Sequence, residues 1–238
     1  SVEQALADLA RFVSWFAKGR PVVTFGCSYA GALSAWFRVR YPNVTIGAIS
    51  SSGVVNPVLD FHQFDTQVST SLRNVDKPCL ALLYEANKLI DDLAITDPRK
   101  VMAMFNTTGF HVLDFLYYVA DAAAETVQYG YQDTLCKYLK GSNGNVVERY
   151  ADFVNQFYAN VFLGGDVISY SRYHVQLPRQ SGTRAWWWQT CYELAYFQTA
   201  PKHLSIRSHR LDLNYFKDFC GYVFQGLSWP PATARIAN

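Results

Sequence analysis

Apolar residues recur every three or four positions between residues 2 and 18, which is the spacing of an amphipathic helix. Ser1 stands just before this run and Gln4 follows three residues later, so we expect a capping box at the start of the helix. Gly19 follows the last residue of the run. Because glycine is common directly after a helix, the pattern predicts that the helix ends there.

Two short segments are typical of strands. Residues 22–26 are apolar and β-branched, which predicts a buried parallel strand, and residues 44–49 predict a second strand. Helical spacing returns between them, over residues 31–41. The order helix, strand, helix, strand indicates an α/β sheet with crossover helices.

From about residue 60 the pattern becomes almost wholly helical. The predicted helices, separated by turn signals, cover roughly residues 61–75, 79–94, 98–105, 110–128 and 145–162. Residues 186–191 then look extended and buried, so we expect a strand there that returns to the sheet. Residues 213–225 predict one more helix. The whole pattern indicates an α/β core that carries a helical insertion.

The composition excludes several classes of protein. Half of the 238 residues are hydrophobic and only 17% are charged, which argues against a disordered chain. The net charge is only +2 and there is no basic run, so no nucleic-acid partner is expected. No apolar stretch has the length of a membrane span, and no signal-peptide pattern is visible.

Five cysteines are spread along the chain: Cys27, Cys79, Cys136, Cys191 and Cys220. They form no CxxC pair, which argues against a structural zinc site, so we expect no metal and no cofactor. Their spacing is compatible with the disulfides of a secretory protein or with buried free thiols. Glycosylation sequons at Asn43 and Asn106 are compatible with the secretory route.

The candidate chemistry lies in residues 21–31, where a strand candidate meets a turn of small residues with Ser28 at its apex. This is the form of a nucleophile elbow, which lifts a reactive serine out of a sheet. Gly26 meets the need for a small residue there, and Tyr29 would supply a backbone N–H to an oxyanion. The pattern G-x-S-x-G is broken at its last place by Ala30. The alternative interpretation is an ordinary strand-to-helix turn with a serine N-cap.

Further segments, in order along nearly the whole chain, make the match more specific: residues 3–8, 26–31, 35–38, 41–42, 47–52 and 184–193. Together they resemble the lysosomal Pro-X carboxypeptidase family, whose relatives include dipeptidyl peptidase II and thymus-specific serine protease. Members carry G-G-S-Y-G-G around the nucleophile. This chain departs from that motif at Cys27 and Ala30.

The resemblance implies a partial α/β-hydrolase core with a helical cap, and a serine peptidase that cleaves next to proline as a carboxypeptidase or a dipeptidyl peptidase. By this resemblance Ser28 is the nucleophile and Tyr29 supplies one oxyanion N–H. Ala32 and Tyr196 match positions that line the proline pocket, and Glu193 is a candidate for a polar role near it. The implied substrate is a peptide with proline near a terminus, and the implied location is lysosomal or secreted.

The resemblance also suggests roles for the cysteines. Cys79 with Cys136 would brace the helical insertion, and Cys191 with Cys220 would tie the returning strand to its helix. Four cysteines allow three pairings, so the sequence does not fix the connectivity. Cys27 is expected to be a buried packing residue beside the nucleophile.

Three segments follow from these arguments: residues 1–59 as core with the elbow, 60–180 as helical insertion, and 181–238 as the return to the core. The family's turns that carry the catalytic Asp and His have no match here, and no histidine of the chain has a triad signature. We therefore expect an internal fragment of a longer enzyme, inactive in isolation. The alternative functions are a non-catalytic binding protein and a lipase or esterase on the same fold. A homodimer of the full-length protein is a separate possibility for its partner.

Overall fold

The computed structural model describes residues 1–178 and 182–233, and these form two compact units. The first unit contains Ser1–Leu59, Gln189–Tyr196 and residues 230–233. The second unit contains Asp60–Trp188 and Phe197–Trp229.

The first unit is built from two helices, two strands and one short π-helix among its described residues. In chain order they are α1 (Val2–Ala17), β1 (Val23–Cys27), α2 (Tyr29–Arg40), β2 (Gly47–Ser51) and η3 (Thr190–Leu194). Apolar side chains of α1, α2 and η3 meet in one core, made of Val2, Leu6, Val13, Ala17, Phe37 and Leu194. The bounds of α1, α2 and both strands lie within a few residues of those that the sequence pattern predicted.

Helix α1 begins and ends close to the predicted residues. Ser1 is the N-cap, and its hydroxyl accepts a hydrogen bond from the backbone N–H of Gln4 at 3.2 Å. The Gln4 side chain donates to Asp8 at 2.8 Å, so it does not complete the predicted capping box. At the other end Lys18, with φ of 48°, adopts the left-handed conformation that commonly closes a helix.

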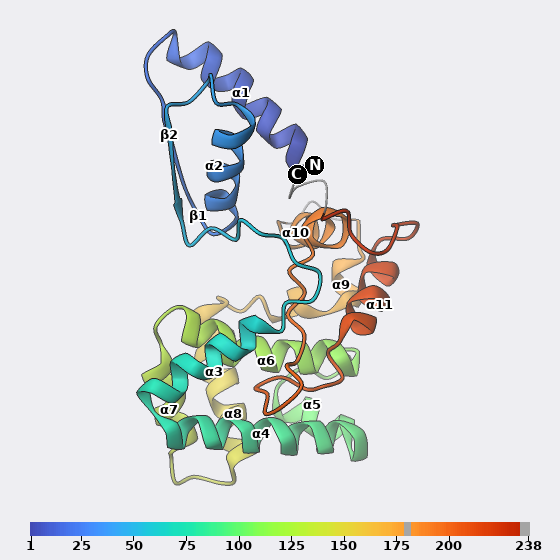
Figure 1. Ribbon diagram of the computed structural model, residues 1–238. Coiled ribbons are helices and arrows are strands. Elements are labelled where there is room, and N and C mark those ends of the chain that lie inside the picture. Colours follow the sequence, from blue (N-terminus) through green and yellow to red (C-terminus); the bar gives the residue numbers. More distant parts are fainter. Residues whose placement is uncertain (179–181, 234–238) are drawn as a thin grey trace. The chain divides into compact units, whose positions relative to one another are not determined.

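Strands β1 and β2 pair in parallel, as predicted, with Val23 opposite Gly47 and Cys27 opposite Ser51. Both helices lie on one side of the strands (Figure 1). The other face of the sheet carries Val23, Phe25 and Ile49, and Phe25 is 68% exposed. The prediction that β1 is buried was therefore wrong. The described residues cover the face of the sheet that packs against the helices and leave the opposite face exposed.

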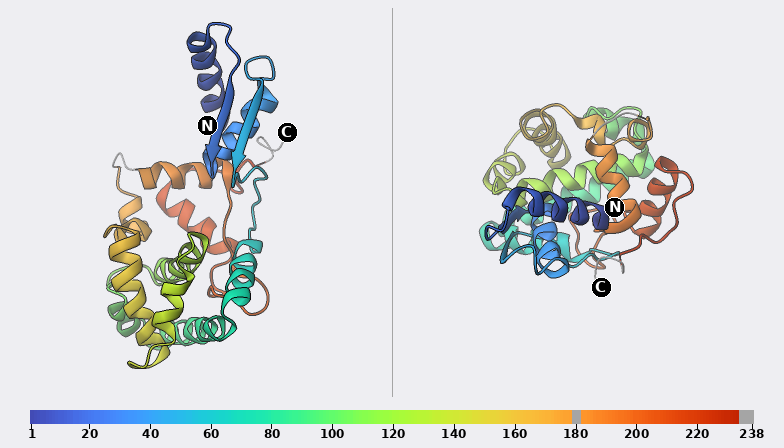
Figure 2. Two further views of the ribbon diagram at one scale, coloured as in Figure 1. Left: turned by 90° about the vertical axis from the view of Figure 1, so that its left-hand side faces the viewer. Right: turned by 90° about the horizontal axis from the view of Figure 1, so that it is seen from above.

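The second unit is helical throughout its described segments, apart from one isolated bridge between Asp60 and Phe197. Its helices are α3 (Gln63–Val75), α4 (Lys77–Thr96), α5 (Pro98–Met104), α6 (Val112–Gln128), α7 (Gln132–Leu139), α8 (Val146–Phe153), η1 (Val154–Phe162), η2 (Val167–Tyr170), α9 (Arg172–Val175) and α11 (Leu213–Val223). Helix α6 packs against α3, α4, α5, α7, η1 and η2, among others; the helices of this unit carry the colours from cyan to red in Figure 2. The predicted helical region is confirmed, but α7, η2 and α9 were missed because so few turns give little periodicity.

The strand expected at residues 186–191 is absent, and this prediction was wrong. The chain instead forms α10 (Gly182–Gln189), which continues into η3. Trp187 is 9% exposed whereas Trp186 is 41% exposed, so the helix turns one of these aromatic residues inward and leaves its neighbour open. The run of tryptophans has a high preference for strands, but packing of this kind overrides such preferences.

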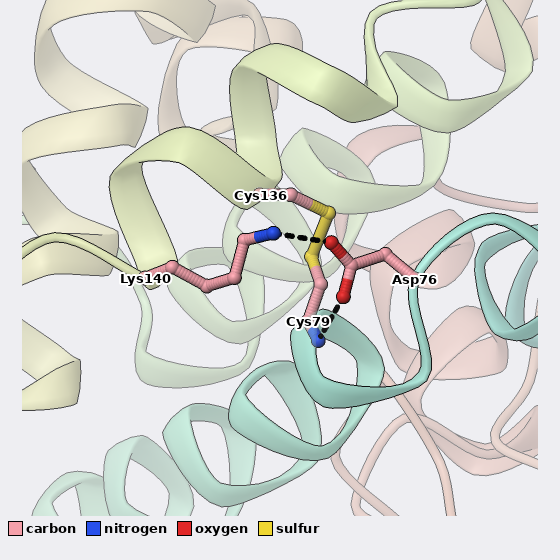
Figure 3. Close-up of a disulfide and its surroundings, with 4 residues drawn as sticks. All are labelled: Asp76, Cys79, Cys136 and Lys140. Carbon is pink, nitrogen blue, oxygen red and sulfur yellow. Dashed lines mark hydrogen bonds and ion pairs between the residues drawn. A yellow bond between two sulfur atoms is a disulfide. The ribbon is translucent and has the colours of Figure 1, made fainter.

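A disulfide between Cys79 and Cys136 joins α4 to α7, which confirms the pairing that the resemblance implied (Figure 3). Asp76 lies beside it and has two roles. Its carboxylate caps α4 by accepting the backbone N–H of Cys79 at 2.9 Å, and it also pairs with the Lys140 ammonium group after α7. These two bonds hold the pKa of Asp76 below its ordinary value, the bond from Lys140 being the larger cause.

Cys191 and Cys220 are also disulfide-bonded. Cys27 is a free thiol and is exposed. Its expected place among buried packing residues was wrong, because alternation along β1 puts it on the same uncovered face as Val23 and Phe25.

Replacing both Cys79 and Cys136 with serine is expected to lower the free energy of unfolding by about 2–5 kcal/mol, because the bond closes a long loop in the unfolded chain. Urea unfolding followed by circular dichroism measures this loss. The matched control is Cys27→Ser, which removes an exposed thiol without breaking a bond and should leave the unfolding midpoint unchanged. A double variant as stable as the wild type would contradict a stabilising role for the disulfide.

Candidate active site

Ser28 forms the turn between β1 and α2 by itself. Its backbone has φ of 55° and ψ of −126°, a conformation that side-chain-bearing residues rarely adopt. Two backbone hydrogen bonds hold it there: its N–H donates to the Ser51 carbonyl at 3.0 Å, and its carbonyl accepts from the N–H of Ala32 at 3.0 Å. The residue itself is exposed. A strained serine on a sharp strand-to-helix turn is the geometry of a nucleophile elbow.

The turn is possible because backbone approaches backbone without side chains between. A Cβ on Gly26 would lie 2.0 Å from the carbonyl oxygen of Ala30, and a Cβ on Gly31 would lie 2.9 Å from that of Ser51. Both distances exclude any residue except glycine. Cys27 and Ala30, where the chain departs from the family motif, are both exposed, so their side chains lie outside this contact.

Tyr29 is the first residue of α2 and packs on the core of the first unit. Burial raises the pKa of its hydroxyl, and the negative charge of Glu193 raises it further. In turn, burial and then the proximity of Tyr29 raise the pKa of Tyr196. Three of the residues singled out from the sequence therefore lie close enough to influence one another.

Glu193 is almost fully buried, with 4% of its surface exposed. One carboxylate oxygen accepts the backbone N–H of Val2 at 2.7 Å, at the start of α1. The unpaired N–H groups and the dipole of a helix N-terminus favour a negative charge at that place. Glu193 thus joins η3 to α1 and carries its charge next to the residue that follows Ser28.

Tyr196 is held by its backbone and its hydroxyl together. Its N–H donates to the Val58 carbonyl at 3.0 Å, and its hydroxyl donates to the Val54 carbonyl. Both Tyr196 and Ala195 have φ of 55°, so two consecutive side-chain-bearing residues are strained. The loop after β2 therefore holds the ring of Tyr196 in a set position.

Ala32 lies on α2, one turn after Ser28, and is fully buried. The structure thus places Ser28, Tyr29, Glu193 and Tyr196 in one unit and puts Ala32 in the packed layer below the turn. Sequence reasoning missed Ser51, whose carbonyl holds the Ser28 N–H. The parallel pairing of the two predicted strands would have indicated it, since Ser51 is opposite the last residue of β1.

A cavity of about 500 Å³ opens in the first unit, a size common for small-ligand sites. Its walls come from the start of α1, the second half of α2, the loop after β2, and η3: Ser1, Val2, Glu3, Leu6, Ala35, Trp36, Val39, Arg40, Tyr41, Val55, Asn56, Tyr192 and Glu193. Of the candidate catalytic and substrate-binding residues, Glu193 lines it, whereas Ser28, Tyr29, Ala32 and Tyr196 do not. The Trp36 indole donates to the Val55 carbonyl at 3.0 Å, which holds that ring in the wall.

All five histidines of the sequence belong to the second unit: His62, His111, His174, His203 and His209. His111 caps α6 by accepting the Leu113 N–H on Nδ1 at 3.3 Å. Burial lowers the pKa of its imidazole. In residues 1–178 and 182–233, no three His, Cys, Asp or Glu side chains are grouped to hold a metal ion. None of the helices in those ranges is long and apolar enough to span a membrane.

A parallel strand, a strained serine and a helix in immediate succession define the nucleophile-bearing part of an α/β-hydrolase fold. The sequence matches the family described as serine carboxypeptidase S28 over residues 1–229, and the chain belongs to that family. It is 36% identical to the "Probable serine protease EDA2" of Arabidopsis thaliana, over 98% of this chain and 51% of that protein.

Two mammalian relatives are more distant. The mouse "Thymus-specific serine protease" is 28% identical over the whole of this chain and 52% of its own length. The mouse "Lysosomal Pro-X carboxypeptidase" is 32% identical over 39% of this chain and 21% of its own length. The chain therefore spans about half the length of the relatives that it matches from end to end.

Gly26→Ala is expected to lower the free energy of unfolding by about 1–3 kcal/mol or more, because its Cβ would displace the turn that carries Ser28. Chemical denaturation checks this, and the matched change is Ala30→Gly, which restores the family residue at an exposed position and should cost less than about 1 kcal/mol. Equal losses in the two variants would argue against the close contact.

Proposed function

We propose that the natural protein containing this chain is a serine peptidase that forms an acyl-enzyme at Ser28. The observation that carries the proposal is the strained, exposed Ser28 on the turn between β1 and α2. Membership of the serine carboxypeptidase family supports it. The same membership favours a peptidase over an ester hydrolase or a non-catalytic binding protein.

In this proposal the Ser28 hydroxyl oxygen attacks the carbonyl carbon of the scissile peptide bond, and a general base takes the hydroxyl proton. The carbonyl oxygen becomes an oxyanion, and the backbone N–H of Tyr29 donates to it. The intermediate collapses when the C–N bond breaks and the proton passes to the leaving amine; water then releases the acyl group. No histidine of this chain is assigned as the base, so we expect the isolated chain to show no peptidase turnover.

We further propose that the protein cleaves next to proline, with Tyr196 at the proline pocket and Glu193 beside it; Ala32, being fully buried, would act only by supporting the turn. Support comes from the printed name of one relative, "Lysosomal Pro-X carboxypeptidase", and from the fixed position of the Tyr196 ring. Carboxypeptidase and dipeptidyl peptidase action are both compatible with this arrangement. Two sets of peptides distinguish these two activities. In one set proline is the next-to-last residue at the carboxyl end, and in the other it is the second residue from the amino end.

A fluorophosphonate probe is expected to label the natural full-length protein at Ser28, because it reacts with activated serine hydroxyls. Labelling is measured by mass spectrometry of the modified peptide, and Ser28→Ala should abolish it. Ser14→Ala is the matched control, since Ser14 is exposed on α1 and only donates to the Ala10 carbonyl. Unchanged labelling in Ser28→Ala, or none in the wild type, would reject the proposed nucleophile.

We also propose that the protein passes through the secretory route to a lysosomal or extracellular location. Asn106 supports this, because it is exposed at φ of 55° in the turn between α5 and α6, and Thr108 of the same sequon is exposed too. In the other sequon Asn43 is exposed, but the Thr45 hydroxyl is buried against the carbonyls of Val22 and Gly47.

Expression through a eukaryotic secretory pathway should therefore attach an N-glycan to Asn106. The measurement is the change in electrophoretic mobility on treatment with a glycosidase that removes N-glycans. Asn106→Gln and Thr108→Ala should both lose the shift at this site, whereas Thr108→Ser keeps the sequon and should retain it. A shift that Asn106→Gln leaves intact would place the glycan elsewhere.

A further inference from the structure

The second unit buries more negative than positive charge around α6. Asp65 and Arg207 are fully buried, Asp121 is 6% exposed, and Glu125 is half-buried one turn further along α6. This cluster, which we call the acidic cluster, holds three carboxyl groups and one guanidinium. Buried charges are costly unless each has a partner, so the imbalance calls for a further positive charge or a proton.

The single guanidinium is committed to two of the three carboxylates. Arg207 donates to both oxygens of Asp65, at 2.8 and 3.1 Å, and to Asp121 at 3.1 Å. It also donates to the Gln198 side chain at 3.3 Å and lies over the ring of Tyr117. Glu125 is therefore the carboxyl group of the cluster that Arg207 does not contact.

Glu125 and Asp121 are bridged by two tyrosines instead. The Tyr158 hydroxyl, from η1, donates to Glu125 at 2.6 Å and lies 2.6 Å from the Tyr170 hydroxyl of η2. The Tyr170 hydroxyl donates to Asp121 at 3.4 Å. Each bond needs a proton on one side, and the two carboxylates repel each other across one turn of helix. A single additional proton relieves that repulsion.

The strongest electrostatic influence on these carboxyl groups, their burial, also favours the protonated form. Burial and then the charge of Asp121 raise the pKa of Glu125 to about 7, against the opposing effects of the hydrogen bond from Tyr158 and the charge of Arg207. Burial also raises the pKa of Asp121 against the effect of Arg207. From α3 only Asp65 acts on this pair, and Tyr117, on α6 itself, donates to Asp121.

We propose that Asp121 and Glu125, bridged by Tyr158 and Tyr170, form a buried proton-binding site that makes the second unit more stable in acid than at neutral pH. An unfolded glutamate releases its proton near pH 4.5, whereas the folded site keeps one to about pH 7. Below about pH 4.5 the site is protonated in the folded and the unfolded protein, and its contribution to stability is fully present. This contribution falls as the pH rises from about 4.5 to about 7 and is lost above that.

The test is the pH dependence of opening of α6, measured on the natural protein by amide hydrogen exchange corrected for intrinsic rates. Between about pH 5 and about pH 8 the equilibrium constant for opening should rise by roughly two orders of magnitude in the wild type relative to Glu125→Gln. The lowered pKa of His111, at the N-cap of α6, acts in the opposite direction, but it does so equally in both proteins and cancels in the comparison. Glu125→Gln cannot bind the proton but keeps an acceptor for Tyr158, so its opening should vary much less with pH. Glu85→Gln, on the exposed side of α4, should follow the wild type.

A second measurement does not depend on any variant folding. The infrared C=O band of a protonated carboxylic acid should persist in the wild type near pH 6 and disappear as the pH rises past neutrality. Absence of a carboxyl group that titrates in this range would overturn the proposal. So would a pH dependence in Glu125→Gln as steep as in the wild type.

Discussion

The turn at Ser28 depends on a contact between two stretches of bare backbone. The Ala30 carbonyl lies where a Cβ of Gly26 would have to be, so β1 passes into α2 through one residue instead of a loop. That abrupt passage places Ser28 at positive φ and turns its N–H toward the Ser51 carbonyl. Strand pairing and helix position are therefore set by the same few backbone atoms that set the serine.

Buried negative charge is stabilised in a different way in each of the two units. In the first, Glu193 is the buried charge, and the N-terminus of α1 accommodates it through the Val2 amide. In the second, Arg207 binds two carboxylates, and Glu125 is bound by the hydroxyl of Tyr158. A helix terminus supplies a fixed partial charge, whereas a carboxyl group bound to a hydroxyl can change its own charge. By our proposal, the second arrangement makes the unit respond to pH near neutrality.

Sequence patterns predicted what local chemistry controls. Periodicity located α1, α2, both strands and the longer helices, and the glycine and serine spacing pointed to Ser28. What failed depended on neighbours remote in sequence. The tryptophans of α10 follow helical packing instead of their strand preference, and Cys27 is exposed because the described residues leave its face of β1 uncovered. The proximity of Glu193 to Tyr29 could not be predicted from the sequence either, because the two residues lie more than 160 positions apart.

The hydrogen bonds that hold Ser28 run from main chain to main chain, to Ser51 on one side and from Ala32 on the other. Point substitutions change side chains and leave such bonds available, so the geometry around the serine is insulated from most sequence drift. The glycines at the close contact, Gly26, Gly31 and Gly53, are vulnerable, because any replacement there adds an atom. This explains how Cys27 and Ala30 can replace family glycines on either side of Ser28 and Tyr29 while the turn keeps its shape. A lineage can vary the surroundings of such a nucleophile widely before it loses the nucleophile itself.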